Sequence, residues 1–373
     1  MADTLGIGVI GCGNISAAYM RLAPLFNGIE MRACADLSEE AAKARAEEFG
    51  LRAESIEGLL AADDVDIIVN LTVPNAHFDV SKRVLEAGKH VYSEKPFVLT
   101  LEEGEALKKI AGEKGLRVGS APDTFLGGAH QLARHLVDSE AVGRITSGTC
   151  FVQSPGMESW HPNPDFFFQP GAGPVLDIGP YYVSNLVQLL GPVKRVVAMS
   201  SSANEYRTIT SQPRHGEKIK VETPTTIHAI LQFESGAQVT FIASWDVWQH
   251  GHSNMELYGT EGTLHVPDPN FFGGEVRVTE KGAFTNISGE WQHPFGKSNE
   301  GTRANYRTAG LADMAQAILA GRPHRCSDDF ATHVVDVMTS ILEAGEEGRA
   351  LDISTTCTRP EALGPDAAQG LLA

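Results

Sequence analysis

Two short segments of the chain carry side chains that could hold an alcohol and move its proton. In the first, Glu94 and Lys95 follow a predicted strand and precede a proline. In the second, Asp177 and Tyr181 are four residues apart, a spacing that places both on one face of a helix. A lysine can hold a substrate oxygen, and a carboxylate beside a phenol can bind and deprotonate a hydroxyl group. Each segment also has a purely structural interpretation, as a surface ion pair and as a capping aspartate beside a core tyrosine.

A glycine-rich turn predicts a dinucleotide site. Residues 11–16 have the sequence Gly-Cys-Gly-Asn-Ile-Ser and lie between a predicted strand and a predicted helix. Gly11 would allow the tight turn, and Gly13 would let the backbone approach a pyrophosphate, with Asn14 and Ile15 at the start of the helix beside it. Such a motif alone is weak evidence for cofactor binding, because glycines also occur at turns where only the backbone geometry requires them. The strand–turn–helix context favours cofactor binding.

A carboxylate at the end of the second predicted strand indicates which cofactor binds. Asp36 lies 23 residues after Gly13, where it would accept hydrogen bonds from the adenosine ribose. A 2′-phosphate there would place like charges a few ångströms apart, at a cost of about 1–4 kcal/mol. The next residue, Leu37, offers no charge to hold a phosphate, and Arg45 is interpreted as a solvated helix residue. NAD is therefore expected, with NADP less favoured.

Another strand end predicts further contacts to the cofactor. Thr72 ends a predicted strand, and Asn75 and His77 follow it at the same edge of the sheet. In open α/β sheets ligands bind at the carboxyl ends of the strands, so this backbone would line the nicotinamide. His77 is expected near the cofactor without a part in the chemistry.

The central part of the chain favours an uncharged substrate. Between Asp123 and Gly191 there is no Lys, and the only Arg residues are Arg134 and Arg144. Phosphates and carboxylates are usually held by Arg or Lys, so we expect a neutral polyhydroxy ligand.

Three polar residues are predicted to contact the hydroxyl groups of that ligand. Asp123 and Thr124 follow the last predicted parallel strand, and His161 lies in a loop rich in aromatic residues over 159–168. Such a loop suits a sugar ring, although it would equally well plug an interface between domains. His250 and His252 have a spacing that metals use, but without a clear third ligand we expect no metal site.

The order of predicted elements defines two domains. Over residues 1–122, short apolar runs at 5–10, 29–35, 66–72, 90–93 and 116–119 alternate with helical patterns. This alternation is typical of a doubly wound parallel α/β sheet. Over residues 123–373, strands at 144–153, 195–202, 226–233, 238–244, 255–258 and 276–279 have short connections. They predict an α+β domain with a large, mostly antiparallel open sheet. The tail beyond residue 359 has little pattern and is expected to be peripheral.

Composition excludes several classes of protein. Of the 373 residues 42% are apolar, which is ample for packed cores, and the formal charge of −17 disfavours nucleic acid as a partner. No stretch predicts a membrane helix, and the first residues do not resemble an export signal. The five scattered cysteines favour a reducing, cytoplasmic compartment.

Taken together, these motifs resemble the GFO/IDH/MocA family of NAD(P)-dependent oxidoreductases. The glycine fingerprint, then Glu94-Lys95-Pro96, then Asp177 and Tyr181 occur in the family's order over nearly the whole chain. The resemblance implies a Rossmann domain followed by an α+β domain whose open sheet forms dimers or tetramers. It also implies hydride transfer to and from sugars and polyols, with Lys95 and Asp177 as catalytic residues. Many members have His where this chain has Tyr181, as in the glucose–fructose oxidoreductase branch.

The tyrosine leaves open whether Tyr181 or Lys95 takes the proton. Two other functions that occur among relatives also stay open: a glycoside hydrolase that uses bound NAD for transient oxidation, and a non-catalytic NAD-binding regulator. Lys95 and Tyr181 argue against the regulator, because a sensor does not need an acid–base group.

Overall fold

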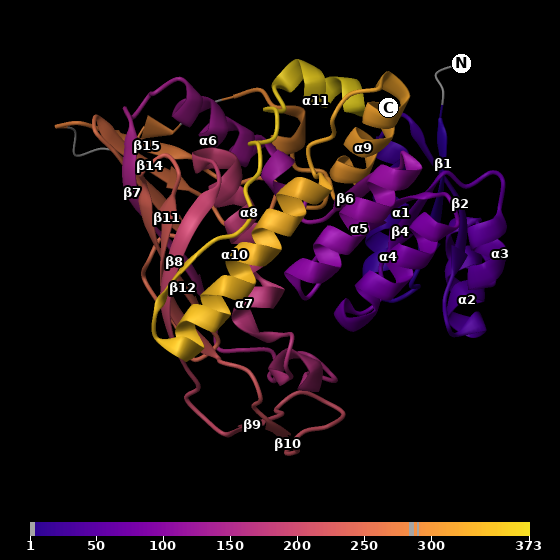
Figure 1. Cartoon of the computed structure of the whole chain (residues 1–373), viewed down its shortest axis with the longest axis horizontal. Helices are drawn as coiled ribbons and strands as arrows, with labels where there is room; N and C mark the ends of the chain where they lie inside the picture. Colours follow the sequence, from indigo (N-terminus) through magenta and orange to yellow (C-terminus); the bar gives the residue numbers. More distant parts are fainter. Residues whose placement is uncertain (1–3, 283–286, 289–290) are drawn as a thin grey trace.

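The computed structural model describes residues 4–282, 287–288 and 291–373 (Figure 1). The N-terminal sheet has six parallel strands in the order β3-β2-β1-β4-β5-β6, the order of a Rossmann domain. The strands are β1 (Leu5–Ile10), β2 (Ile29–Ala35), β3 (Arg52–Glu54), β4 (Ile67–Asn70), β5 (His90–Ser93) and β6 (Val118–Ser120). The prediction of a doubly wound parallel sheet is confirmed.

Local capping explains where two of the helices of this half begin and end. The helices are α1 (Asn14–Leu22), α2 (Glu39–Phe49), α3 (Ile56–Ala61), α4 (His77–Glu86) and α5 (Leu101–Lys114). The Ser38 side chain accepts a hydrogen bond from the third residue of α2, and Thr100 and Glu103 form a capping box at the start of α5. Gly50 and Gly115 end these two helices at φ +68° and +66°, which glycine adopts without steric cost.

The C-terminal half contains a nine-stranded sheet in the order β16-β15-β14-β13-β7-β12-β11-β8-β17. Its strands are β7 (Ile145–Gln153), β8 (Val193–Ser201), β11 (Thr226–Phe233), β12 (Gln238–Ser244), β13 (Met255–Gly259), β14 (Gly262–Val266), β15 (Arg277–Glu280), β16 (Ile287–Ser288) and β17 (Ala350–Asp352). Every described pair is antiparallel except β7 with β12. This confirms a mostly antiparallel sheet. A separate hairpin consists of β9 (Tyr206–Thr208) and β10 (Lys218–Lys220).

Helices cover one face of the large sheet and leave the other open (Figure 1). The helices of this half are α6 (Gly128–Asp138), α7 (Gly173–Asp177), α8 (Gly179–Leu190), α9 (Ala309–Ala320), α10 (Asp328–Glu347) and α11 (Pro365–Leu371). Alternate residues of β11, such as Ile227 and Leu231, are buried beneath them, whereas Ile230 between them is 47% exposed. Helix α10 runs between this sheet and α5, so it joins the two halves. Among the described residues, no helix is long and apolar enough to cross a bilayer.

The expectation of a peripheral tail is wrong. Leu363 is fully buried and Leu371 nearly so, and α11 packs against α9. Leu372 forms a bridge with Phe26, so the end of the chain returns to the N-terminal half, where Figure 1 places both termini. Sequence pattern does not reveal this docking, because α11 is short and contains few large apolar residues.

We predict that replacing Leu363 with Ala lowers the free energy of unfolding by about 2–5 kcal/mol, because the substitution opens a cavity in packed surroundings. Urea unfolding without added cofactor measures this. Leu37→Ala is the matched control, since Leu37 is 93% exposed and its loss should cost almost nothing. Equal stability of the two variants would contradict the burial of the tail.

Candidate active site

The glycine turn after β1 leaves space for a ligand above its backbone. Gly11 has φ +104°, and a Cβ there would lie 2.6 Å from the carbonyl carbon of Leu71, so only glycine fits. A Cβ at Gly13 would instead meet nothing within 4 Å. The buried Ser16 donates a hydrogen bond to the Gly13 carbonyl oxygen at 2.6 Å, which fixes the turn from below. The turn is therefore closed toward the sheet and open toward solvent.

Asp36 lies directly at this turn. Its Oδ2 accepts a hydrogen bond from the Cys12 amide at 2.7 Å and its Oδ1 one from the Ser38 amide at 2.9 Å. The interpretation of Arg45 as a solvated residue is wrong. Its side chain is mostly buried, and it donates to the Gly13 carbonyl oxygen at 3.2 Å while pairing with Glu48.

These residues fit a dinucleotide. The open space above Gly13 would accept a pyrophosphate, and the amides of Asn14 and Ile15 at the start of α1 suit its charge. Asp36 would hold the ribose, with the exposed Leu37 beside it.

Glu94 is a buried carboxylate that joins three parts of the chain. Its Oε1 accepts hydrogen bonds from the Tyr19 hydroxyl at 3.0 Å and from Arg307 Nη1 at 2.8 Å, and its Oε2 accepts one from the Lys95 amide at 2.9 Å. Burial alone would raise the pKa of Glu94, but the charges of Arg307 and Lys95 outweigh it and lower the pKa. Glu94 therefore stays ionised and holds Arg307 in place.

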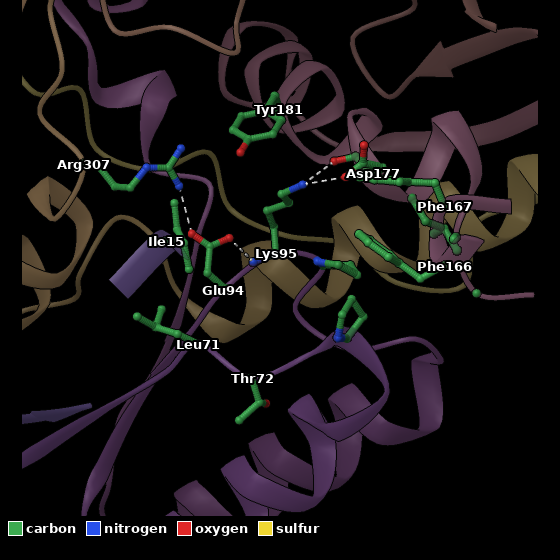
Figure 2. Close-up of a pocket in the computed structure, with 15 residues that line it drawn as sticks. Ile15, Leu71, Thr72, Glu94, Lys95, Phe166, Phe167, Asp177, Tyr181 and Arg307 are labelled. Carbon is green, nitrogen blue, oxygen red and sulfur yellow. Dashed lines mark hydrogen bonds and ion pairs between the residues drawn. The ribbon is translucent and has the colours of Figure 1, made fainter. Parts of the chain in front are cut away.

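Lys95 extends across to the C-terminal half. Its Nζ donates to the Asp177 carboxylate at 2.9 Å and to the Asp177 carbonyl oxygen at 2.7 Å (Figure 2). Burial favours the neutral amine, but the charges of Asp177, Tyr181 and Glu94 outweigh it and raise the pKa of Lys95. Lys95 is therefore an ammonium ion at neutral pH.

Asp177 and Tyr181 face the same space from consecutive helices. Asp177 is the last residue of α7, and Tyr181 lies in the first turn of α8, after a break at Ile178. The Lys95 Nζ lies 5.3 Å from the centre of the Tyr181 ring, and the Tyr181 hydroxyl points toward the space between Lys95 and Arg307 (Figure 2).

These side chains line one cavity of about 360 Å³ between the two halves. Phe166 and Phe167 form part of its wall. The structure thus brings to one cavity six of the residues predicted for the site: Ile15, Thr72, Glu94, Lys95, Asp177 and Tyr181.

Other residues predicted for the cofactor have different surroundings. Asn75 is exposed in the short 3₁₀ turn Pro74–Ala76 that precedes α4. His77 is 1% exposed, and its ring nitrogens lie 2.7 Å from the Pro96 carbonyl oxygen and 3.0 Å from that of Thr72. Burial lowers the pKa of His77. His77 thus connects Thr72 and Pro96, which line the cavity, but is not itself part of the lining.

The three residues predicted to contact the other hydroxyl groups of the substrate, Asp123, Thr124 and His161, are not among those that line this cavity. Oδ2 of the buried Asp123 accepts hydrogen bonds from the Thr308 and Gly310 amides, both at 3.0 Å, and Thr124 is buried beside it. Asp123 is 1% exposed, and its carboxylate holds the segment that carries Arg307. His161 packs edge-on against Phe166 and Phe167, so it supports the cavity wall from behind.

Arg307 is the residue of the cavity that sequence reasoning missed. It lies just before α9, where the sequence does not distinguish it from a solvated residue at the start of a helix. It also lies far outside the segment 123–191, whose few cations favour a neutral ligand. The cavity therefore does contain a second cation. Its lining is still balanced, with Lys95 and Arg307 against Glu94 and Asp177.

His250 and His252 lie with their rings 6.0 Å apart. In the part of the chain that the structure describes, no three His, Cys, Asp or Glu side chains are grouped as metal ligands would be.

Comparison with family models matches both halves of the chain. Residues 5–121 match the model described as the oxidoreductase family with an NAD-binding Rossmann fold, and residues 130–265 match the GFO/IDH/MocA C-terminal domain.

Individual proteins are also similar. The dTDP-3,4-didehydro-2,6-dideoxy-α-D-glucose 3-reductase of Streptomyces violaceoruber is 31% identical over 70% of this chain and 72% of its own. The D-xylose 1-dehydrogenase (NADP⁺) 2 of Haloferax volcanii is 25% identical over 93% of this chain and 99% of its own. Among solved structures, levoglucosan dehydrogenase in complex with NADH has a TM-score of 0.80 at 22% identity, over 95% of this chain and 100% of its own. That structure has the same fold.

Asp123 should make stability depend on pH. Burial raises its pKa from 3.8 to about 6, although Arg307 and the two amide donors oppose the shift. Over roughly pH 4–6 the Asp123 carboxyl group keeps its proton in the folded protein, whereas it has released it in the unfolded chain. The contribution of Asp123 to the free energy of unfolding therefore falls as the pH rises. The asparagine of Asp123→Asn does not titrate. The difference in unfolding free energy between this variant and the wild type should therefore change by up to about 3 kcal/mol in favour of the variant from pH 4 to pH 7.

Urea unfolding at a series of pH values measures this difference. Leu37→Ala, which removes an exposed side chain without a titratable group, is the control and should give a difference that does not vary with pH. A flat difference for Asp123→Asn would contradict the assignment.

Proposed function

The chain belongs to the GFO/IDH/MocA family of NAD-binding oxidoreductases, and from this we propose that it transfers a hydride between a nicotinamide cofactor and a secondary hydroxyl or ketone of a neutral sugar, glycoside or polyol. The observation that carries the proposal is the convergence of Lys95, Asp177 and Tyr181 on one cavity beside the glycine turn. The similar D-xylose 1-dehydrogenase of Haloferax volcanii is named for a neutral sugar and supports this substrate class.

The three side chains have separate roles in the mechanism. The Lys95 ammonium donates a hydrogen bond to the reacting oxygen, and Asp177 keeps the Lys95 amine directed into the cavity. Tyr181 accepts the hydroxyl proton in oxidation and returns it in reduction. A bound nicotinamide supplies the hydride acceptor or donor, so that the C–H electron pair leaves the carbinol carbon as the C=O bond forms. The protein contributes mainly orientation and placement of charge.

The balance of charges supports a neutral substrate. Each cation of the cavity faces a carboxylate, Lys95 with Asp177 and Arg307 with Glu94. An anionic substrate would have to compete with these pairs. Phe166 and Phe167 offer an apolar surface for the face of a sugar ring.

Asp36 supports a preference for NAD over NADP. Its carboxylate lies at the glycine turn, where a 2′-phosphate would meet like charge. Arg45, which could neutralise such a phosphate, already pairs with Glu48.

We further propose a cytoplasmic homodimer or homotetramer that assembles through the open face of the large sheet. On that face Val197 pairs across strands with Ile230, and Met199 beside them is 76% exposed, so the three form an apolar patch. The cysteines, all of them free, support a reducing compartment.

Incubation of the purified protein with NAD and a panel of neutral sugars tests the activity, with NADH absorbance as the readout. Lys95→Met should lower kcat by at least about 100-fold and leave NAD binding intact, because the Lys95 side chain faces the reacting oxygen and not the glycine turn. Exposed Lys43→Met on α2 is the control. Sugar release without NADH, or full turnover by Lys95→Met, would contradict the proposal.

The cofactor preference has its own test. Asp36→Ser removes the carboxylate and should shift the NADP-to-NAD ratio of kcat/KM toward NADP by about fivefold or more, from a repulsion of about 1 kcal/mol or above. Glu39→Gln nearby on α2 removes an exposed charge and serves as the control. An unchanged ratio in Asp36→Ser would show that Asp36 does not select the cofactor.

A further inference from the structure

The cavity has an aromatic wall that continues into solvent. Phe167 lines the cavity and is 9% exposed, whereas Phe166 also lines it but is 51% exposed. Their ring centres lie 4.0 Å apart with an angle of 31° between the ring planes, so the two rings form one surface. Figure 2 shows both on the Asp177 side of the cavity, away from Ile15 of the glycine turn. The wall therefore leads outward on the side that faces away from the predicted cofactor contacts.

A third large ring extends this wall. Trp160 is 62% exposed, and its ring packs edge-on against His161 with the ring centres 5.4 Å apart. His161 in turn packs edge-on against Phe166 at 5.4 Å and against Phe167 at 5.3 Å. Exposure thus rises from Phe167 through Phe166 to Trp160 along one connected set of rings. Exposed apolar side chains that are grouped beside a cavity are typical of a ligand-binding groove.

Contacts to the β9–β10 connection hold the wall in place. Asp165 lies in the 3₁₀ turn Asp165–Phe168 that carries both phenylalanines, and its carboxylate pairs with Arg214 of that connection. The Ser211 hydroxyl of the same connection donates a hydrogen bond to the His161 carbonyl oxygen at 2.6 Å. A surface that is ordered before its ligand arrives lowers the entropic cost of binding.

Charge and space indicate what this wall accepts. The charges beside it are already paired, Asp165 and Glu217 with Arg214, so the ligand is neutral like the sugar expected in the cavity. The cavity volume of about 360 Å³ is near the lower end of the range for ligand pockets, and it must contain both the nicotinamide and the reacting sugar. A further ring attached to that sugar would therefore lie at the mouth of the cavity, over Phe166 and Trp160. Flat aromatic side chains provide a large apolar contact area for such a ring.

We propose that Phe166 and Trp160 form a binding subsite for a neutral ring that is joined by a glycosidic bond to the sugar undergoing oxidation. The inference rests on the proposed function and narrows it, because it makes a glycoside or an oligosaccharide the preferred substrate over a free monosaccharide. The reacting sugar lies in the cavity beside Lys95 and Tyr181, and the attached ring stacks on Phe166. The attached ring takes no part in hydride transfer and contributes binding only.

Paired substrates isolate the contribution of the attached ring. The methyl and the phenyl glycosides of D-glucose, D-galactose and D-xylose are each incubated with the protein and NAD, and NADH absorbance gives kcat/KM. The wild type should favour the phenyl over the methyl glycoside of the sugar that it oxidises by about tenfold, the effect of one stacked aromatic pair together with the area that it buries. Phe166→Leu, which keeps an apolar side chain without a flat ring, should lose this preference. Phe166→Tyr, which keeps the ring, should retain it.

Two further variants test the extent of the subsite. Trp160→Ala should weaken the preference for the phenyl glycoside, because it removes the outer ring of the wall. Trp248→Ala is the matched control and should retain the preference, since Trp248 is 88% exposed and is not among the residues that line the cavity.

Binding of the same glycosides to the NADH-bound protein, measured by calorimetry, separates the subsite from the reaction, because no oxidation occurs there. Tighter binding of the phenyl glycosides that Phe166→Leu loses, without NADH formation from NAD and any of these glycosides, would refute the proposed function and leave the subsite intact. Equal binding of the phenyl and methyl glycosides, equal kcat/KM for the two, or a preference that persists in Phe166→Leu would overturn the inference.

Discussion

The ion pair between Lys95 and Asp177 is the interaction on which the candidate site depends. Lys95 follows a strand of the N-terminal sheet and Asp177 ends a helix of the C-terminal half, so the pair spans the cavity between them. Removing two charges from water is costly, and the pair repays this only with good geometry. Lys95 gains that geometry from a second bond to the Asp177 carbonyl oxygen. The result is an ammonium ion whose position is defined before any substrate binds, which lowers the cost of orientation during reaction.

A second ion pair completes the site from a third part of the chain. Arg307 binds Glu94, the residue next to Lys95, and Asp123 holds the segment from which Arg307 extends. The Lys95–Asp177 and Arg307–Glu94 pairs both join the end of a strand of the N-terminal sheet to the C-terminal half. A displacement of either half would therefore disturb the cofactor side and the substrate side together.

Much of this could be predicted from the sequence, because periodicity and capping act locally. The parallel sheet and the glycine turn depend on short motifs, whereas the trio of Lys95, Asp177 and Tyr181 is indicated by the resemblance to the family. The position of Arg307 could not be predicted, because it depends on how the segment before α9, 130 residues after Asp177, docks against Glu94. The partners of Asp123 could not be predicted for the same reason, because the amides of Thr308 and Gly310 are remote from it in sequence. Long-range packing is not encoded in any local pattern.

The central claim is that one sugar oxygen is held by the Lys95 ammonium and the Tyr181 phenol together. A crystal structure with NAD and a sugar that the enzyme oxidises measures this directly. We expect a single carbinol oxygen within about 3.2 Å of both Lys95 Nζ and the Tyr181 hydroxyl. A sugar bound with its reacting oxygen beyond reach of either group would contradict it.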